Sequence, residues 1–535
     1  MTRTLYRHAR VFTADERGFA EALVVDGARI AFVGTEADAV AQAGPTAASV
    51  DLEGRLVLPG FVDAHTHLLM TGDALGQVGL THARTLADIQ DLLRRARAEG
   101  ADDAPLRGRG WLFDAVPGGR PTAAMIDEAV ADVPVYLDAN DYHSCWVNSS
   151  ALAELGITRE TPDPIGGRIG RDAHGEPDGM LYETAAQQFA WAHRDATTTD
   201  AQRDASVERV IAAYLAAGVT GVVDMAFDAH GLAAFERAHA RRGGSLPLRV
   251  AAHWFVANTG DDDANLAQVA RAAELAAASG AVRVVGIKLV LDGTIDACTA
   301  AMRDSYANGS NAEPIWPAER LDPVVAAADA AGMQIALHAI GDAASTMALD
   351  AIEHAIAANG PRPRRHRIEH LEYAAPGTAE RMARLGVTAS MQPVHADPAI
   401  FANWAAQLGD ARAERGFAWR EYEEAGALLA FSTDAPTAPL DALANMYVAA
   451  TRASALDPAV PAVHPQQAVP LDRALAHATR DAATSIGDGS WRGRLAPGYA
   501  ADFAVVDADP FGDPAALLSA RVVRTVVDGR TAFEE

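Results

Sequence analysis

The middle of the chain alternates short apolar runs with helical stretches, which is the pattern of a parallel sheet wrapped by helices. Eight of the apolar runs are candidate strands, at Gly60–His67, Val219–Met225, Leu248–Phe255, Val284–Leu291, Gln334–His338, His366–His370, Val387–Met391 and Leu428–Thr433. Between them, apolar residues recur at helical spacing and predict helices at Asp263–Ser279, Ala318–Ala331, Asp342–Ala358 and Pro376–Leu385. The pattern predicts the α/β class and a (β/α)8 TIM barrel over about residues 58–484.

Both ends of the chain have a different sequence pattern, with short runs of β-branched residues around turn residues. In the first segment, Asp26 and Gly27 form a hairpin signal between two such runs. Because chain ends commonly lie close together, we expect residues 1–57 and 485–535 to form one composite β-sandwich. The gap between the first two barrel strands is far longer than a crossover, so about residues 72–200 are expected to be an insertion capping the active site.

Composition and charge exclude several classes of protein. With 45 Lys and Arg against 71 Asp and Glu, the chain has a net charge of −26, which repels phosphate backbones and anionic membranes. We therefore expect a small-molecule substrate and neither a nucleic-acid nor a membrane partner. Two cysteines are too few for a disulfide scaffold, and the first residues lack an apolar stretch of signal-peptide length, so the cytoplasm is the expected location. The sequence does not fix the oligomeric state, for which a homodimer is the working expectation.

Lys288 is the one lysine of the chain, and the other 44 basic residues are arginines. A solvated surface charge is largely indifferent to which of the two residues carries it. A partly buried lysine, however, loses its proton and does chemistry at nitrogen, whereas arginine stays protonated. Chance survival of one lysine is the alternative, and the place of Lys288 in the fourth predicted strand favours a chemical role.

Candidate chemistry gathers at the carboxyl ends of the predicted strands, where parallel barrels carry their catalytic groups. His65 and His67 end the first strand and share a face, because side chains alternate along a strand. Four other strands contribute one metal-competent side chain each, and the full set is His65, His67, Lys288, His338, His370 and Asp434. Their convergence on one rim predicts a metal site with the imidazole and carboxylate donors that zinc favours.

The motifs around these residues resemble the amidohydrolase superfamily of metal-dependent hydrolases, from LVLPGFVDAHTH to the closing GRLAPGYAADFAVVD. The segments WVNSSALAELGI, GGRIGRDAHGEPDGMLYE, LHAIGD and RIEHLE look like the amidohydrolase 3 branch, which includes N-substituted formamide deformylases. The resemblance spans nearly the whole chain. It implies a distorted barrel with a composite β-sandwich and a site that holds one or two divalent ions, usually zinc.

The same resemblance implies how the ligands are shared. Carried over motif by motif, the two first-strand histidines and Asp434 hold one zinc ion, and His338 and His370 hold the other. The end of the fourth strand shows no Glu or Asp that could bridge the two ions. Members of the superfamily with a lysine at this place commonly carboxylate it, so Lys288 is expected as an N6-carboxylated bridge.

The expected reaction is hydrolysis of a carbon–nitrogen bond other than a peptide bond, in an amide, N-formyl or N-acyl compound. A zinc-activated hydroxide is expected to attack the carbonyl carbon beside the Lys288 bridge, while Asp434 takes the proton and passes it to the leaving nitrogen. A mononuclear deaminase is a weaker alternative, because His338 is followed by Ala-Ile-Gly-Asp and not by the usual nearby glutamate. An esterase or lactonase on the same scaffold stays open, and a non-catalytic barrel is least expected because all six ligands are present.

Other polar residues near the strand ends are weaker candidates. His143 in the insertion, and Gln392 and His395 after the seventh strand, are candidates for substrate contacts. His366 begins the sixth strand, at the opposite end of the barrel, and is expected to be structural. Glu369 is expected to face away from the histidine that follows it and to pair with an arginine.

Overall fold

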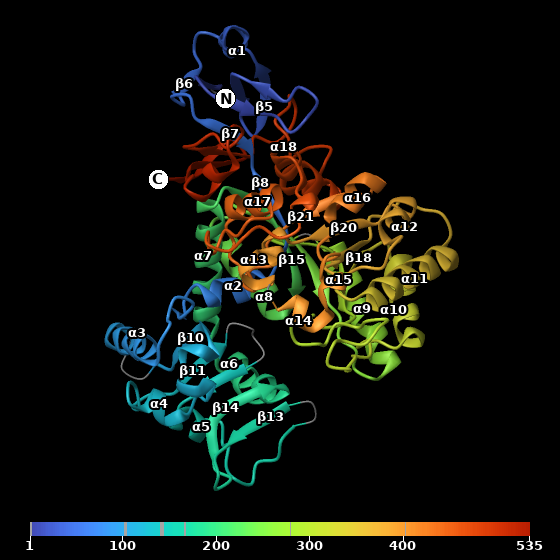
Figure 1. Cartoon of the computed structure of the whole chain (residues 1–535). Coiled ribbons are helices and arrows are strands. Elements are labelled where there is room, and N and C mark those ends of the chain that lie inside the picture. The colour runs from blue at the N-terminus through green and yellow to red at the C-terminus, as the bar shows by residue number, and fades with distance from the viewer. Residues whose placement is uncertain (1–2, 101–103, 140–143, 165–166, 279, 402) are drawn as a thin grey trace. The chain divides into compact units, whose positions relative to one another are not determined.

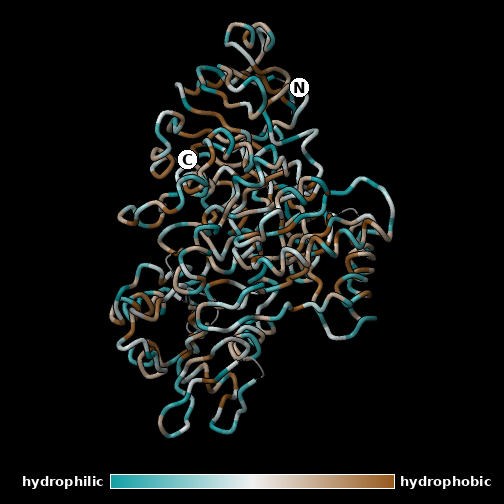
Figure 2. Tube along the Cα trace, turned by 45° about the vertical axis from the view of Figure 1, so that its right-hand side comes forward, coloured by the Kyte–Doolittle hydropathy of each residue, from teal (hydrophilic) through white to brown (hydrophobic). Residues whose placement is uncertain are grey.

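The computed structural model describes residues 3–100, 104–139, 144–164, 167–278, 280–401 and 403–535 (Figure 1). The chain divides into two compact units. The first combines Met1–Leu68 with Val210–Glu535, and the second is Leu69–Arg209. Polar and apolar segments alternate along the trace (Figure 2), and none of the described helices is long and apolar enough to cross a membrane.

Eight parallel strands form the central sheet of the first unit, in the spatial order β21-β20-β19-β18-β17-β16-β15-β8. In chain order they are β8 (Phe61–Thr66), β15 (Val219–Phe227), β16 (Arg249–Phe255), β17 (Arg283–Val290), β18 (Gln334–Ala339), β19 (Arg367–His370), β20 (Thr388–Met391) and β21 (Leu429–Phe431). Every position of β8, β19, β20 and β21 is buried, as expected for a parallel sheet that is covered on both faces. The predicted α/β barrel is confirmed.

The first and last strands meet through backbone hydrogen bonds at their carboxyl ends. Asp434 N donates to His65 O at 2.8 Å, and His67 N donates to Ala435 O at 2.9 Å. Both bonds join the segment that follows β21 to the end of β8. The closure of the barrel therefore also fixes the backbone of three predicted metal ligands.

Helices follow the barrel strands and cover the outer face of the sheet (Figure 1). The longer ones are α8 (Ala229–Arg241), α9 (Asp262–Ala277), α10 (Ala318–Ala330), α11 (Asp342–Asn359), α12 (Thr378–Leu385), α16 (Trp419–Ala425) and α17 (Ala442–Thr451). Four of them match the predicted helices closely. Helix α12 begins at Thr378 and not at Pro376, because Gly377 adopts a left-handed conformation with φ of 86°.

Strands from both termini build a β-sandwich in the same unit. One sheet has the order β5-β4-β1-β6 and the other β24-β23-β22-β7-β2-β3. These strands are β1 (Thr4–Arg7), β2 (Arg10–Phe12), β3 (Phe19–Ala20), β4 (Ala22–Asp26), β5 (Arg29–Gly34), β6 (Ala48–Asp51), β7 (Leu56–Pro59), β22 (Phe503–Val506), β23 (Val522–Val527) and β24 (Arg530–Glu534). The N-terminal β7 pairs antiparallel with the C-terminal β22, with Leu58 opposite Ala504. Tyr6 and Phe503 pack edge to face between the two sheets, with ring centroids 5.0 Å apart.

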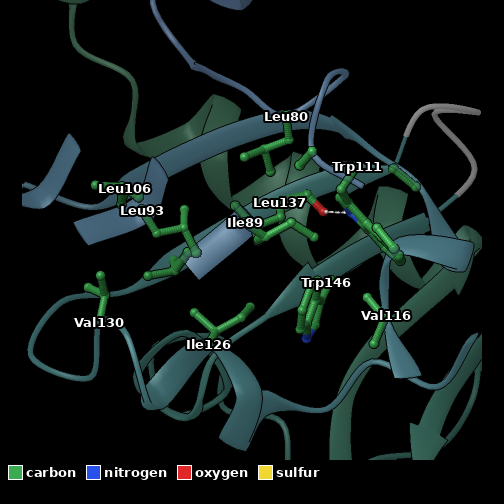
Figure 3. Packing of buried hydrophobic residues seen from close by; sticks show 14 of the residues in the cluster. Leu80, Ile89, Leu93, Leu106, Trp111, Val116, Ile126, Val130, Leu137 and Trp146 are labelled. Atoms are coloured by element: carbon green, nitrogen blue, oxygen red, sulfur yellow. Dashed lines mark hydrogen bonds between the residues drawn. The ribbon is translucent and has the colours of Figure 1, made fainter. Parts of the chain in front are cut away.

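The second unit contains a six-stranded mixed sheet of its own, which the sequence pattern did not predict. Its strands are β9 (Val78–Gly79), β10 (Leu106–Trp111), β11 (Val135–Ala139), β12 (Ser144–Val147), β13 (Gly167–Arg171) and β14 (Pro177–Glu183). Helix α3 (Leu86–Glu99) supplies Ile89 and Leu93 to a core that also holds Trp111 and Trp146 (Figure 3). Trp111 Nε1 donates to Leu137 O at 3.0 Å. The expectation that this segment caps the active site stays a prediction.

Candidate metal centre

The six predicted ligands lie in the carboxyl-terminal half of their strands or just beyond. His65 is in β8 and Lys288 in β17, while His338 and His370 lie at the ends of β18 and β19. The other two, His67 and Asp434, follow the ends of β8 and β21. Distances between their side chains show that the fold brings the set together.

Asp434 lies between the two histidines of the first strand. Its Oδ1 atom is 3.3 Å from His65 Nε2 and 3.0 Å from His67 Nε2. Burial alone would raise the pKa of the Asp434 carboxyl, but the two imidazoles hold this pKa well below its usual range. Asp434 is therefore an ionised, buried carboxylate with one oxygen aimed at two nitrogen donors.

Lys288 is buried beside the same group, with its Nζ atom 3.4 Å from His65 Nε2. Burial lowers the pKa of Lys288 to about 8, although the carboxylates of Glu369 and Asp434 act in the opposite direction. A substantial share of this side chain is thus neutral near pH 8. A neutral amine has the lone pair that reaction at nitrogen requires.

His338 and His370 form the other side of the cluster. Their ring centroids are 4.4 Å apart, and the His370 ring is 4.8 Å from that of His65. Burial and nearby Lys288 lower the pKa of His338 to about 3, and burial with the neighbouring His338 holds the pKa of His370 well below its usual range. Both rings are neutral at physiological pH, which is the form of imidazole that binds a metal.

This donor set fits divalent metal ions. Ligand atoms of His65, His370 and Asp434 all lie within 4.8 Å of one another, and all three residues are buried. Nδ1 of His67 is also buried and makes no hydrogen bond to any described residue. Neutral imidazoles around an ionised carboxylate are the donors found in zinc sites.

Comparison with known proteins agrees with this geometry. The model of the amidohydrolase family that is called Amidohydro_3 matches residues 48–533. The chain belongs to the amidohydrolase family. The resemblance predicted from the motifs is thereby confirmed, and the family is one of hydrolases.

Two relatives and one solved structure extend this match along the chain. The amidohydrolase is 31% identical to the protein LONG AFTER FAR-RED 3 of Arabidopsis thaliana, over 99% of its own length and 91% of the relative's. It is 29% identical to an N-substituted formamide deformylase of Arthrobacter pascens, over 98% and 97% of the two lengths. A metal-dependent hydrolase of Pyrococcus furiosus superposes with a TM-score of 0.77 at 24% identity, covering 95% of this chain and all of that one.

A second buried group adjoins the candidate ligands and involves a residue that sequence reasoning missed. His395 Nδ1 lies 3.1 Å from Glu372 Oε1, and His395 Nε2 lies 3.6 Å from Asp434 Oδ2. Ligand atoms of His370, Glu372 and His395 also lie within 4.8 Å of one another. Glu372 follows the sixth strand after left-handed residues at His370 and Leu371, with φ of 75° and 52°, so strand alternation could not place it.

The remaining sequence predictions have different outcomes. Gln392 Oε1 accepts from His370 Nδ1 at 2.8 Å, and Gln392 Nε2 donates to Ser432 Oγ at 2.9 Å, so this amide holds a ligand in place. Its contact with substrate, like that of His395, stays a prediction. His143 lies outside the described residues. His366 pairs with Asp329 at 3.0 Å, as a structural residue would.

Glu369 differs in part from its expected placement. It pairs with an arginine, Arg367, as predicted, and both side chains are fully buried. It does not face away from the neighbouring ligand, however, because both Glu369 and His370 contact His65. The left-handed conformation of His370 breaks the alternation on which the prediction rested.

Proposed function

We propose that this amidohydrolase hydrolyses the carbon–nitrogen bond of an amide, N-formyl or N-acyl compound other than a peptide. The observation that carries the proposal is the buried Asp434 carboxylate, which adjoins two imidazoles on one oxygen and a third on the other. Similarity to the N-substituted formamide deformylase over nearly the whole of both chains supports this substrate class.

In this proposal two zinc ions occupy the centre. His65, His67 and Asp434 would hold one ion, and His338 and His370 would hold the other. When bound, such ions lower the pKa of water toward neutrality and polarise a carbonyl oxygen. Every other task falls to side chains of the protein.

Lys288, carboxylated at Nζ to a carbamate, would supply a further carboxylate for holding the metal. Its neutral Nζ forms a bond to the carbon of CO2, the amine loses a proton to solvent, and the product carries a carboxylate on a lysine stem. Burial, the lowered pKa of the amine and the 3.4 Å approach to His65 Nε2 support this assignment. Arginine cannot substitute, because its guanidinium stays protonated.

Asp434 carries the proton during the reaction. As a base it accepts a proton from the attacking water, and as an acid it returns that proton to the leaving nitrogen. His395 Nε2 is buried and makes no hydrogen bond within the described part of the chain, so it is free to contact the substrate beside Asp434 Oδ2. The Glu372 carboxylate fixes the His395 ring from the other side.

The metal content tests the proposed site. Protein purified without chelators and with bicarbonate is expected to contain about two zinc equivalents per chain by elemental mass spectrometry. One equivalent would overturn the paired site and favour a mononuclear deaminase or amide hydrolase. No metal, with none taken up on addition, would favour a non-catalytic barrel.

A substrate panel tests the reaction itself. N-formyl and N-acyl amines are expected to release amine and carboxylic acid, and Asp434→Asn is expected to abolish the release. Esters and lactones form the comparison set, because the same centre could cleave them. Turnover of esters or lactones without any turnover of amides would replace the proposal with an esterase or lactonase.

A further inference from the structure

A chain of three buried side chains lies behind His65. Glu369 Oε2 lies 2.7 Å from His65 Nδ1. The same carboxylate receives Arg367 through two contacts, Nε to Oε1 at 2.5 Å and Nη2 to Oε2 at 3.0 Å. All three side chains are at most 1% exposed, so water does not compete for these contacts.

The rest of the barrel holds this chain in place. Arg367 Nη2 also donates to Ala64 O at 2.8 Å and to Ser390 Oγ at 2.6 Å. Arg367 thereby links its own strand β19 to β8 on one side and β20 on the other. Glu369 is anchored by the bidentate arginine, so its carboxylate has a fixed position when it meets His65.

The charge of Glu369 determines which His65 nitrogen carries the proton. Both oxygens of the Glu369 carboxylate accept from the buried guanidinium of Arg367, which favours the ionised acceptor form. An ionised carboxylate cannot donate, and His65 Nδ1 must therefore donate to it. Nε2 is then left with its lone pair directed at Lys288 and Asp434, where the metal ligands converge.

The other two predicted imidazole ligands have different partners. His370 Nδ1 meets the neutral amide oxygen of Gln392 at 2.8 Å. His338 Nε2 meets the backbone oxygen of Gly293 at 3.4 Å and lies 3.5 Å from Asp292 Oδ1. A carboxylate acceptor makes an imidazole more basic than a neutral acceptor does, and a more basic imidazole binds a metal more tightly. Among these three residues, His65 has the closest carboxylate, Glu369 at 2.7 Å.

We propose that Glu369 is a positioning residue, which locks His65 in the form protonated at Nδ1 and sets the affinity of the ion that His65 binds. Arg367 is the counter-charge that keeps Glu369 in this role. The proposal rests on the proposed function only through His65 as a metal ligand and is independent of the substrate.

The test compares two buried arginine–carboxylate–histidine groups. Asp329 accepts from Arg364 Nε at 2.7 Å and lies 3.0 Å from His366 Nε2, but His366 is not a predicted ligand. Asp329→Asn is therefore the matched control for Glu369→Gln. Zinc dissociation constants are measured by competition with a chromophoric chelator, which requires no substrate. Glu369→Gln is expected to weaken zinc binding by about 10- to 100-fold, and Asp329→Asn is expected to leave it unchanged.

Two further measurements separate this role from a general loss of folding. Glu369→Gln leaves Arg367 buried without its counter-charge, so the double variant Arg367→Met with Glu369→Gln removes both charges together. The double variant is expected to fold and still to bind zinc weakly. In metal-free wild-type protein, 15N NMR is expected to find the proton of His65 on Nδ1, with the signal assigned from a His65→Ala spectrum.

Either of two results would overturn the proposal. One is wild-type zinc affinity in the folded double variant, and the other is a His65 ring protonated at Nε2 alone in the metal-free protein. Failure of the proposed function is a different outcome, because an unreactive substrate panel would leave the zinc affinities and the NMR signal as predicted.

Discussion

At Lys288 the proposed role requires a neutral amine that reacts at nitrogen, which arginine cannot provide because it stays protonated. Lys288→Ala is expected to lose at least one zinc equivalent and to reduce kcat/KM by about 100-fold or more, because the bridging carboxylate is gone. Short-chain carboxylic acids should partly restore activity in Lys288→Ala by occupying the vacated space. Elemental analysis and steady-state kinetics, with and without added acetate, check this expectation.

Lys288→Arg serves as the control for that experiment. It keeps a cation at the position but can neither form a carbamate nor admit the added acid, so acetate should not rescue it. Full metal content and full activity in Lys288→Ala, without any added acid, would show that the carbamate bridge is wrong.

Asp329 makes a pH-dependent contribution to stability. Burial alone would raise its pKa, but hydrogen bonds from Arg364, Asn359 and His366 lower it to about 2. The usual aspartate pKa is about 3.9. A lowered pKa stabilises the fold fully above that usual value, and the stabilisation disappears as the pH falls from about 4 to about 2.

Asp329→Asn should therefore lower the free energy of unfolding by about 2 kcal/mol near neutral pH. Urea denaturation of both proteins between pH 7 and pH 2.5 measures the difference. The gap between wild type and variant should narrow as the pH falls below about 4. A gap that stays constant over that range would mean that the Asp329 charge does not stabilise the fold.

Some residues of the site could be predicted from the sequence and others could not. The convergence of the six candidate ligands could be predicted, because strand alternation and the barrel rim place them without any knowledge of packing. Glu372 could not, since the backbone turns left-handed at His370 just before it. The partnership of Glu369 with His65 was missed for the same reason, because it joins residues 304 positions apart across a strand end that breaks the alternation.

Among the elements, the barrel strands were predicted to within a few residues, whereas the sheet of the second unit was not predicted. Most of the barrel strands are largely apolar, since both faces of a parallel sheet are buried, and β19 with its sequence RIEH is an exception. Strands β9 and β13 of the second unit are short or carry arginine and glycine, and they pair in a mixed order that no local signal encodes. The pairing of strands that lie far apart in the sequence and have little hydrophobic periodicity is determined by tertiary packing.

Strands β17 and β18 approach each other closely at Gly286. A Cβ atom there would lie 1.9 Å from the backbone oxygen of Gln334, which cannot move without shifting β18. Gly286→Ala is expected to cost about 3 kcal/mol of unfolding free energy, as overpacking against rigid backbone does. Because Lys288 is two residues further along β17, zinc content should fall as well.

Gly512→Ala is the control for this strand substitution, since a Cβ atom at Gly512 meets nothing within 4 Å. Its unfolding free energy should stay within about 0.5 kcal/mol of wild type. Urea denaturation of the two variants side by side makes the comparison. Equal stability of Gly286→Ala and Gly512→Ala would contradict the close approach of β17 and β18.

For the whole molecule, the sandwich and the metal centre share one continuous segment. Gly60 alone separates β7 from β8, and β7 is buried in a sheet whose next strand, β22, comes from the other end of the chain. A chain that ends at residue 500 lacks β22, β23 and β24, which leaves one edge of β7 unpaired while β2 still pairs with the other. It is expected to lose cooperative unfolding and zinc binding together.

A chain that ends at residue 527 is the matched control. It removes the edge strand β24 but keeps β22 and β23 on β7. Circular dichroism during thermal unfolding should show that the chain ending at residue 527 is folded, and elemental analysis should show that it binds zinc. If the chain ending at residue 500 behaved in the same way, the barrel would not need the C-terminal strands.

The burial of Lys288 has a practical consequence for labelling the molecule. With no second lysine in the sequence, the exterior has no side-chain amine, and its positively charged side chains are all arginine or histidine. Succinimidyl esters and amine-directed crosslinkers therefore find no lysine on the outside of the fold. A lysine adduct on the native protein would report access to the metal centre, so the same reagents become probes of whether that centre is open.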